Sequence, residues 1–412
     1  MKKKILFVTY GGGHVNLIIP IIKEMKKSSE FEYTVIGLNT AIPKLLDAKI
    51  NYKSINDYIV YLQQPHKIYE LGKKLSEVHH NYKLPELKIE HSIGYFGVGM
   101  YDLINTLGEN EAWALFHSQG RKAFLPVSVF EKILDIEKPD YVITTCGVRF
   151  EKAVVLAANK KNINTIRIYN MWINPENFTP VKYHFVMNQH CCDKLIEFGI
   201  IPDKIFITGQ PAFDNIFEAL SITDKKNLLE ELNLSEDKKI ILWASDDLDP
   251  GDILLNEIID TFYLLDEYQL IIKPHPNEAM ERFEKALKER RLNNVVLLKD
   301  IDVQRLIKLS DIVITFVSTC GFEAYLASKI LITVNLTGLT KYDFYKDMGI
   351  SIHVDNKGKL AQVLPNTFSD IAYFKTITAR IQYNVLPEAA KRVLDTILLN
   401  DLHLNSEDSY ET

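Results

Sequence analysis

A buried strand, a glycine turn and an amphipathic helix follow one another at the N-terminus. Lys4–Thr9 (KILFVT) is a short apolar run, Gly11–Gly13 ends it, and Val15–Lys27 carries apolar residues at helical spacing. Tyr33–Leu38 is a second apolar run of strand length. Two strands joined by a helical crossover pair in parallel, whereas antiparallel strands can be joined by a short turn. This order predicts a parallel sheet covered by helices.

The alternation of strands and helices continues through most of the chain. In the first half, further strands are expected at Tyr141–Thr144, Asn164–Tyr169 and His184–Met187. Between Tyr58 and Phe124 the pattern is mostly helical, with a loop expected at His91–Leu103. In the second half, the expected strands are Lys239–Ala244, Gln269–Lys273, Asn294–Leu298, Asp311–Phe316 and Ile330–Val334. We therefore predict an α/β protein of two doubly wound parallel-sheet domains that meet near residue 210 and face a central cleft.

Composition is that of a soluble globular protein, and the 412 residues are enough for two domains. The net charge of −6, from 48 basic and 54 acidic residues, argues against a dedicated nucleic-acid binder. The four cysteines lack C-x-x-C spacing, which fits a reducing compartment. The apolar run behind Met1–Lys4 is too short for a signal peptide, and no stretch has the length of a transmembrane helix. We expect a cytoplasmic protein, with peripheral contact at the inner face of the membrane left open.

The glycine turn Gly11–Gly13 and His14 lie at the carboxyl end of the first strand, where open parallel sheets bind ligands. Glycines let a ligand approach the backbone, and the helix that follows supplies unpaired N–H groups. The motif is neither G-x-G-x-x-G nor a Walker A loop, and this disfavours nicotinamide cofactors. We expect His14 to serve as a general base near neutral pH. The alternative is a tight turn whose histidine only caps the helix.

A second motif, Lys273-Pro274-His275-Pro276, follows an apolar strand in the second half. The two prolines restrict the backbone on both sides of the histidine. An imidazole held in this way can donate a hydrogen bond to a phosphate oxygen, and Lys273 adds positive charge. A purely structural turn is the alternative.

A third motif joins the strand DIVITFV to a short helix. Ser318, Thr319, Cys320 and Gly321 place small residues at a helix N-terminus, which is typical of a phosphate site. Glu323 lies in the first helical turn, where it can accept hydrogen bonds from two ribose hydroxyls. The alternative is an ordinary N-cap.

Four further residues are expected near the cleft. Ser245 and Asp246 end the first strand of the second half, Arg149 follows a strand end of the first half, and Gln210 lies in the turn between domains. The acidic run around Asp246 and Asp249 fits a helix N-cap loop better than a metal site. The histidine and cysteine pairs elsewhere lack partners at ligand spacing, so no metal site is expected.

Together these segments resemble the GT-B fold glycosyltransferases and their relatives, the non-hydrolysing UDP-sugar 2-epimerases. The resemblance covers nearly the whole chain and rests on KILFVTYGGGH, KIFITGQPAFD, IIKPHP and DIVITFVSTCGFEAYLASKILITV. The His-Pro and Ser/Thr motifs are similar to those of bacterial sialyltransferases and capsule Kdo transferases. The KPHP region also resembles the CDP-glycerol phosphotransferases, but the glycine-rich start does not.

The resemblance implies a role for each domain and for the residues at its strand ends. Residues 1–210 would form the acceptor domain and 211–380 the nucleotide-sugar domain, while 381–412 would supply a helix that crosses back to the first domain and a disordered tail. The implied donor-binding residues are Gln210, Ser245, Lys273, His275, Pro276, Ser318, Thr319, Cys320, Gly321 and Glu323. The implied acceptor-binding residues are Gly11, Gly12, Gly13, His14 and Arg149, and the implied catalytic residues are His14, His275 and Asp246.

The implied function is transfer of a sugar from a UDP- or CMP-linked donor to a glycan or glycoconjugate, in bacterial cell-surface polysaccharide biosynthesis. GT-B enzymes usually need no metal ion, so the nucleotide sugar is expected as co-substrate and no cofactor is required. The 2-epimerases carry Arg-Pro-Glu where this chain has GGGH, and a second glutamate where Ala324 follows Glu323. Both departures favour transfer over epimerisation. A 2-epimerase or nucleotide-sugar hydrolase, and an inactive glycan-binding or scaffold module, remain the alternatives.

Overall fold

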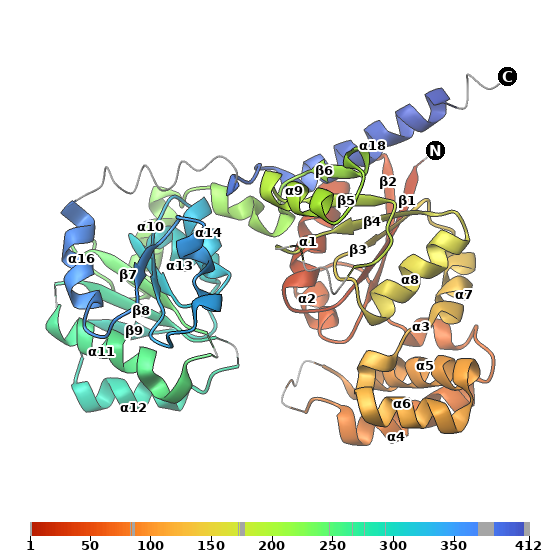
Figure 1. The fold of residues 1–412 in the computed structure, drawn as a ribbon, viewed down its shortest axis with the longest axis horizontal. Coiled ribbons are helices and arrows are strands. Elements are labelled where there is room, and N and C mark those ends of the chain that lie inside the picture. Colours follow the sequence, from red (N-terminus) through yellow and green to blue (C-terminus); the bar gives the residue numbers. More distant parts are fainter. Residues whose placement is uncertain are drawn as a thin grey trace. The chain divides into compact units, whose positions relative to one another are not determined.

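The computed structural model divides the chain into two compact units (Figure 1). The first unit comprises Met1–Asp214 and Val385–Thr412, and the second comprises Asn215–Asn384. The structure describes residues 2–407, except positions 83, 85–86, 172, 174–177, 247, 266, 276, 293 and 370–382. Within these described ranges, no helix combines the length and the apolar character needed to cross a membrane.

The first unit is built on a parallel sheet of six strands in the order β2-β1-β3-β4-β5-β6. The strands are β1 (Lys3–Thr9), β2 (Phe31–Gly37), β3 (Tyr141–Thr144), β4 (Asn164–Ile168), β5 (Tyr183–Val186) and β6 (Ile205–Ile207). Alternate residues of β1 enter two different cores, because successive side chains of a strand point to opposite faces. Ile5 and Phe7 pack with α1 (Gly13–Met25), whereas Leu6 and Val8 pack with α7 (Val127–Glu137) and α8 (Arg149–Lys160).

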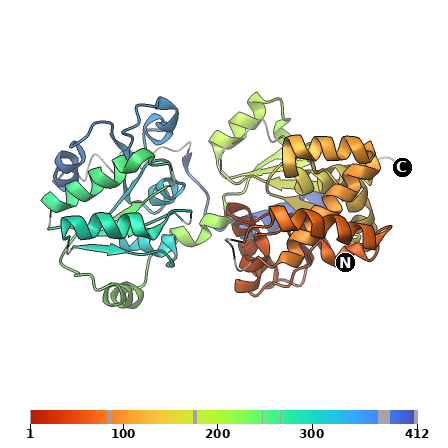
Figure 2. The same cartoon turned by 90° about the horizontal axis from the view of Figure 1, so that it is seen from below.

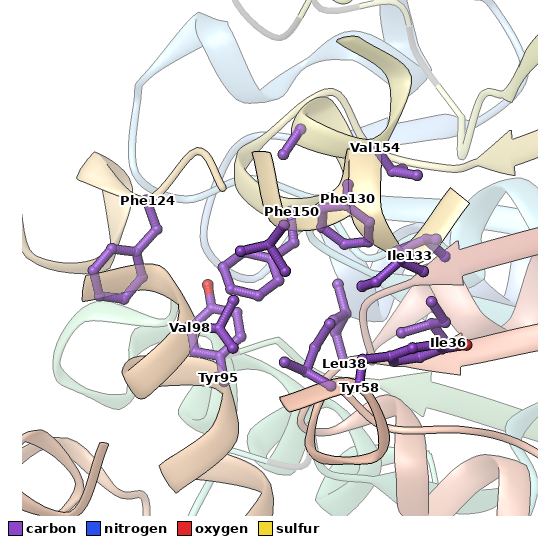
Figure 3. Close-up of a cluster of buried hydrophobic side chains, with 14 of the residues drawn as sticks. Ile36, Leu38, Tyr58, Tyr95, Val98, Phe124, Phe130, Ile133, Phe150 and Val154 are labelled. Atoms are coloured by element: carbon purple, nitrogen blue, oxygen red, sulfur yellow. The ribbon is translucent and has the colours of Figure 1, made fainter. Parts of the chain in front are cut away.

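Between β2 and β3 the chain leaves the regular alternation of strands and helices. The helices after α2 (Ala41–Asp47) and before α7 are α3 (Asn56–Ile59), α4 (Pro65–His79), α5 (Ile89–Leu107), α6 (Glu109–Gln119) and the short helix η1 (Gly120–Ala123). Figure 3 shows how Tyr58 and Tyr95 from this layer lie in one core with Ile36 and Leu38 and with Phe150 of α8. The rings of Tyr95 and Phe150 stack with centroids 4.5 Å apart.

The loop expected at His91–Leu103 is wrong, because this segment lies inside helix α5. Its glycines are contact points between helices. A Cβ at Gly97 would lie 2.3 Å from the carbonyl oxygen of Ile68, and one at Gly72 would lie 2.1 Å from that of Ile93. Glycine disfavours an isolated helix by about 1 kcal/mol relative to alanine, but here it allows the backbones of α4 and α5 to touch. The free energy gained from this close packing of α4 against α5 cannot be recognised from the sequence of α5 alone.

The C-terminal helix α18 (Ala389–Glu407) belongs to the first unit. Its first backbone N–H groups, those of Ala389 and Ala390, donate to the carboxylate of Asp214 at 2.7 and 2.8 Å. A carboxylate at a helix N-terminus satisfies unpaired donors and complements the helix dipole. Val393 and Ile397 are fully or almost fully buried in the core that includes α1.

The second unit contains another parallel sheet of six strands, in the order β12-β11-β10-β7-β8-β9. The strands are β7 (Ile240–Ala244), β8 (Gln269–Lys273), β9 (Val295–Leu297), β10 (Ile312–Thr315), β11 (Ile330–Val334) and β12 (Ile352–Val354). The main helices are α10 (Ile222–Glu231), α11 (Ile253–Leu264), α12 (Met280–Arg290), α13 (Val303–Leu309), α14 (Cys320–Leu326) and α16 (Leu360–Ser369). In Figure 2, α11 and α12 (green and teal) lie side by side over one face of this sheet.

In each sheet the strand order changes direction once along the chain, and we call this place the switch point. In the first sheet β2 lies on one side of β1 and β3 lies on the other. In the second sheet β8 and β9 lie on one side of β7, and β10 lies on the other. The connections on either side of such a switch point leave a crevice beyond the carboxyl ends of the two central strands, where open α/β sheets bind ligands. The predicted α/β class and the two doubly wound parallel sheets are confirmed.

Candidate functional site

The switch point of the first unit begins with the glycine turn after β1. A Cβ at Gly11 would lie 2.2 Å from the Thr40 hydroxyl oxygen and 2.6 Å from its carbonyl oxygen, so no larger residue fits. Gly12 has φ +67°, a backbone conformation that disfavours L side chains. Lys44 Nζ holds the turn by donating to the Gly12 carbonyl at 3.1 Å. These contacts give a fixed turn at the start of α1.

A cavity of about 810 Å³ opens beside this turn, entirely within the first unit. Gly11, Gly12, His14 and Arg149, which the sequence placed at the acceptor site, all line it. Gly13 is close to Asn170, since a Cβ there would lie 3.1 Å from the Asn170 amide nitrogen. Nδ1 of His14 is buried and accepts or donates no hydrogen bond to any other residue that the structure describes. His14 therefore lines the cavity with one ring nitrogen that no described residue hydrogen-bonds.

Arg149 is held at the cavity wall by aromatic residues. It begins α8 with φ +51°, an unusual conformation for a residue with a side chain, and its guanidinium lies 4.5 Å from the ring centroid of Tyr10. The Tyr10 hydroxyl in turn lies 3.2 Å from that of Tyr95 and accepts the Phe150 N–H at 3.3 Å. A strained residue that is held by such contacts commonly marks a functional position.

The carboxylate of Glu151, which sequence reasoning missed, joins the two central strands at this switch point. It is fully buried and accepts from the N–H groups of Tyr10 at 3.1 Å and of Thr145 and Cys146 at 2.6 Å. Its three donors lie directly after β1 and β3. The sequence contains no signal for this role other than an acidic residue in the first turn of α8.

Gln210 lies in the first unit and is 1% exposed. Its side-chain amide donates to the carbonyls of Tyr169, at 3.2 Å, and Asn170, so it supports the end of β4. The structure gives Gln210 this supporting role, and its contact with a donor nucleotide stays a prediction.

In the second unit, the turn after β8 is held by a buried carboxylate, Glu278. Its Oε2 accepts the His275 N–H at 2.8 Å and the Ser245 hydroxyl, and its own N–H donates to the His275 carbonyl at 2.9 Å. Arg282 lies 3.3 Å from Glu278 Oε1 and also pairs with Asp249 at 2.8 Å. Glu278 follows His275 by three residues, a spacing typical of a turn cap that could have pointed to it.

The hydrogen bonds of this turn also set the state of the His275 ring. Nδ1 accepts the N–H of Asn277 at 3.2 Å, so the neutral imidazole carries its proton on Nε2. His275 is half-buried. Lys273 donates its ammonium to the carbonyl of Lys299, and burial lowers the pKa of Lys273. Pro276 lies outside the described residues.

At the switch point between β7 and β10, side chains link the two strand ends. The Asp246 carboxylate accepts the Val317 N–H at 3.2 Å, and the Thr315 hydroxyl donates to the Ala244 carbonyl at 2.9 Å. Asp246 is 6% exposed, and burial raises its pKa. Ser245 is also buried. Asp246 thus acts first as a bridge between strands.

The loop Ser318–Cys320 and the start of α14 lie beside this bridge, but fewer of their amides remain for an anion than the motif suggests. Gly321 N–H donates to the Ser318 carbonyl at 3.0 Å, and Phe322 N–H donates to the Tyr345 hydroxyl at 3.2 Å. The Cys320 N–H lies 3.4 Å from the Ser318 hydroxyl. Thr319 is exposed and makes no side-chain cap. Burial raises the pKa of the Cys320 thiol to about 12, so the thiol stays protonated at neutral pH.

Burial also changes the pKa of Glu323, which lies in the first turn of α14. Burial raises its pKa to about 7, while a hydrogen bond from Gln304 Nε2 at 2.9 Å lowers it and the charge of Asp302 raises it. The carboxyl is therefore poised between its neutral and ionised forms at physiological pH.

The structure brings together in one unit all the donor-site residues except Gln210 and Pro276: Ser245, Lys273, His275, Ser318, Thr319, Cys320, Gly321 and Glu323, with Asp246 among them. Asp249 accepts the N–H groups of Leu254 and Leu255 at 2.9 and 3.1 Å, so its carboxylate satisfies two backbone donors in the first turn of α11, whose N-cap residue is Asp252. Across the described part of the chain, no three His, Cys, Asp or Glu side chains converge as metal ligands.

Comparison with known proteins gives a family and a fold. Residues 127–343 match the family described as CDP-Glycerol:Poly(glycerophosphate) glycerophosphotransferase. The processive diacylglycerol beta-glucosyltransferase of Bacillus pumilus is 20% identical over 425 residues, which cover 98% of this chain and 97% of that protein. The match to the family begins after the glycine turn and spans β3 to β11.

Two solved structures align over almost their whole length. The UDP-GlcNAc 2-epimerase of Neisseria meningitidis, bound to UDP-GlcNAc, has a TM-score of 0.67 at 15% identity and covers 96% of this chain and 99% of its own. A glycosyltransferase from Rickettsia africae has a TM-score of 0.54 at 15% identity over 100% of both chains. At such low identity these likenesses show the fold, which is the GT-B arrangement of two parallel-sheet units.

Proposed function

This chain belongs to the CDP-glycerol:poly(glycerophosphate) glycerophosphotransferase family, within the GT-B superfamily of nucleotide-sugar enzymes, and on this premise we propose that it is a glycosyltransferase that moves a sugar from a UDP- or CMP-linked donor to a glycan or glycoconjugate acceptor. The proposed setting is bacterial cell-surface polysaccharide biosynthesis at the cytoplasmic side of the membrane. The observation that carries the proposal is the His275 turn, a half-buried imidazole fixed at a strand end beside Lys273 and the Ser318 loop.

The donor is assigned to the second unit. Nε2 of His275 and the ammonium of Lys273 would donate to the phosphate oxygens, and Glu323 would accept from the ribose hydroxyls. When the bond between the anomeric carbon and the phosphate oxygen breaks, negative charge grows on the leaving nucleotide. Donors held in place before the reaction stabilise this charge without reorganisation. We assign this role to protein side chains rather than to a metal ion.

The acceptor is assigned to the cavity of the first unit. Its hydroxyl oxygen would attack the anomeric carbon while the imidazole of His14, which lines this cavity, takes the hydroxyl proton. The alternative base is Asp246 of the second unit: one of its carboxylate oxygens accepts the Val317 N–H, while Oδ1 has no hydrogen-bond partner among the described residues.

A second reaction, glycerophosphate transfer from CDP-glycerol, is favoured by the family match over residues 127–343. The two reactions break different bonds. Sugar transfer from a UDP-sugar releases UDP and carries no phosphorus to the acceptor. Glycerophosphate transfer breaks the bond between the two phosphates, releases CMP and leaves a new phosphodiester on the acceptor.

The first test is a thermal-shift screen with UDP, CMP, CDP and GDP, because a ligand that binds only the folded chain raises its melting temperature. The donor selected in this way is then incubated with and without acceptors, and products are followed by chromatography and ³¹P NMR. A UDP-sugar turned over only with an acceptor supports sugar transfer. CMP release with a new phosphodiester supports the second reaction, and an epimer or free sugar without acceptor supports an epimerase or hydrolase.

The His275→Ala variant tests the assignment of the site. Losing one preorganised donor to a developing anion typically lowers turnover by about 10²–10³. His66→Ala, an exposed histidine on α4 outside both sites, is the matched control and should keep full turnover. Equal turnover by His275→Ala and the wild-type chain would contradict the role of this turn.

A further inference from the structure

One buried side chain, that of Tyr345, joins the Ser318 loop to the first turn of α14. Its hydroxyl donates to the Ser318 carbonyl at 2.8 Å and accepts the Phe322 N–H at 3.2 Å. Tyr345 is 1% exposed and lies 27 and 23 residues further along the chain than these two partners. Burial holds the pKa of the Tyr345 hydroxyl well above its usual value of 10, so the hydroxyl keeps its proton and can donate it.

The two backbone groups that the hydroxyl contacts also have other partners. The Ser318 carbonyl accepts the Gly321 N–H at 3.0 Å. The Phe322 N–H donates to the Thr319 carbonyl at 3.0 Å. If the hydroxyl were absent, both groups would keep a hydrogen bond, and neither would be left buried without a partner. The hydroxyl therefore restricts the shape of the loop beyond what hydrogen-bond satisfaction requires.

The ring of Tyr345 restricts the same loop by its volume. A Cβ at Gly321 would lie 2.7 Å from the ring carbon Cε2 and 3.0 Å from Cζ. Because Gly321 has no side chain, the loop backbone can lie directly against the ring. The ring and the hydroxyl thus contact the loop at three consecutive places, at Ser318, Gly321 and Phe322.

Tyr345 is itself held in place by the sheet of the second unit. It lies in α15 (Phe344–Asp347), a helix of four residues, which is too short to persist without tertiary contacts. Asp343, the N-cap residue of α15, accepts a hydrogen bond from Asn335 at 2.6 Å and lies 3.4 Å from Nε2 of His353. Asn335 directly follows β11 and His353 lies in β12, so two strand ends anchor the helix that carries Tyr345.

We propose that Tyr345 is a positioning residue for the donor nucleotide: its hydroxyl sets the positions of Ser318 and Glu323 before the nucleotide binds. The inference rests on the proposed function, which places the Ser318 loop and Glu323 at the donor. Tyr345 is buried, so it acts through the loop and not by touching the nucleotide. Glu323 directly follows Phe322, so a shift of the Phe322 N–H also moves the carboxyl. A loop already held in its bound shape loses less entropy on binding, and the nucleotide binds more tightly.

The experiment measures nucleotide binding to the full chain by isothermal titration calorimetry, with no acceptor present. The probes are UDP and CMP, the nucleotides that the two reactions under Proposed function release. Tyr345→Phe keeps the ring and removes only the hydroxyl, so the variant should fold, and it should bind the probe about tenfold more weakly than the wild-type chain does. Tyr342→Phe is the matched control, because it removes a hydroxyl from the same connection between β11 and β12, and it should leave the affinity unchanged.

Two further variants separate positioning from a general loss of structure. Once the loop has shifted in Tyr345→Phe, Ser318→Ala should cost less affinity than it costs in the wild-type chain, because changes that act through one shared element are not additive. Asp343→Asn loosens the anchor of α15 without altering Tyr345 or the loop, and it should weaken probe binding in the same direction. Thermal melts of each variant without ligand show that the loss of affinity belongs to the folded chain.

Three results would overturn the inference: equal affinity of the wild-type chain and Tyr345→Phe, an equal loss in Tyr342→Phe, or the same cost of Ser318→Ala in both backgrounds. These outcomes are separate from the proposed function. An active transferase whose nucleotide affinity does not depend on the Tyr345 hydroxyl refutes only this inference. A chain that transfers no group but loses nucleotide affinity in Tyr345→Phe refutes only the transfer, and a wild-type chain that binds neither probe refutes both.

Discussion

Replacing Glu323 by glutamine should stabilise the second unit more at pH 8 than at pH 5. Burial raises the pKa of Glu323 to about 7 in the folded chain, against an ordinary value of 4.5. The folded chain binds the proton of this carboxyl more tightly than the unfolded chain does. The stabilisation that comes from binding this proton is therefore complete below pH 4.5 and is lost as pH rises through about 7. Above pH 7 the buried carboxylate is ionised and costs stability.

The magnitude follows from the difference between the two pKa values. A change from 4.5 to about 7 corresponds to about 3 kcal/mol of unfolding free energy at pH 8. At pH 5 the same difference has cost only about 1 kcal/mol. Glutamine carries no charge at either pH and can still accept from Gln304, so the gain should rise by about 2 kcal/mol between pH 5 and pH 8. Any packing cost of the substitution is the same at both pH values and cancels.

The assay is urea unfolding followed by the fluorescence of Trp243, which is fully buried on β7 of the second unit. The other two tryptophans, Trp113 and Trp172, are replaced by phenylalanine in the parent chain so that only this unit reports. Glu284→Gln, at an exposed position in α12, is the control and should show no such change with pH. A gain for Glu323→Gln that is equal at pH 5 and pH 8 would refute the reasoning.

Two other substitutions test the two turns. The Glu278 carboxylate accepts the His275 N–H at 2.8 Å and pairs with Arg282, and Glu278→Gln removes its charge. We expect turnover to decrease by about tenfold with little change in KM. A turnover equal to that of the Glu284→Gln control would contradict this. Gly11→Ala places a Cβ 2.2 Å from Thr40, whereas Gly12→Ala meets open space and only an unfavourable φ. The second change should cost about 1 kcal/mol, and the first should cost clearly more in thermal melts; the reverse order would contradict the close approach of Gly11 to Thr40.

The amino-acid sequence alone determined the strands and the residues at their ends. Runs such as Ile5–Val8 and Ile312–Ile314 are apolar at every position and buried on both faces of the sheet, so their pattern is visible in the sequence without any neighbouring strand. Gly12 and the prolines around His275 act through their own backbone preferences, which are also local. The sequence was therefore enough to predict the α/β class and to indicate the Gly11 and His275 turns as sites.

Tertiary structure alone decided which of these residues meet and what holds them. His14, Arg121 and Arg149 come from three elements far apart in the chain, and only the packing of α4–α6 beside the switch point makes them walls of one cavity. The buried carboxylates Glu151 and Glu278 were missed because an acidic residue in a helix or turn is ordinarily solvated. Both carboxylates have their roles because the fold places backbone N–H groups within hydrogen-bond distance of them. Helix α5 was missed because its glycines are favourable only in the folded chain, where Gly94, Gly97 and Gly99 lie against Asn56, Ile68 and Phe124.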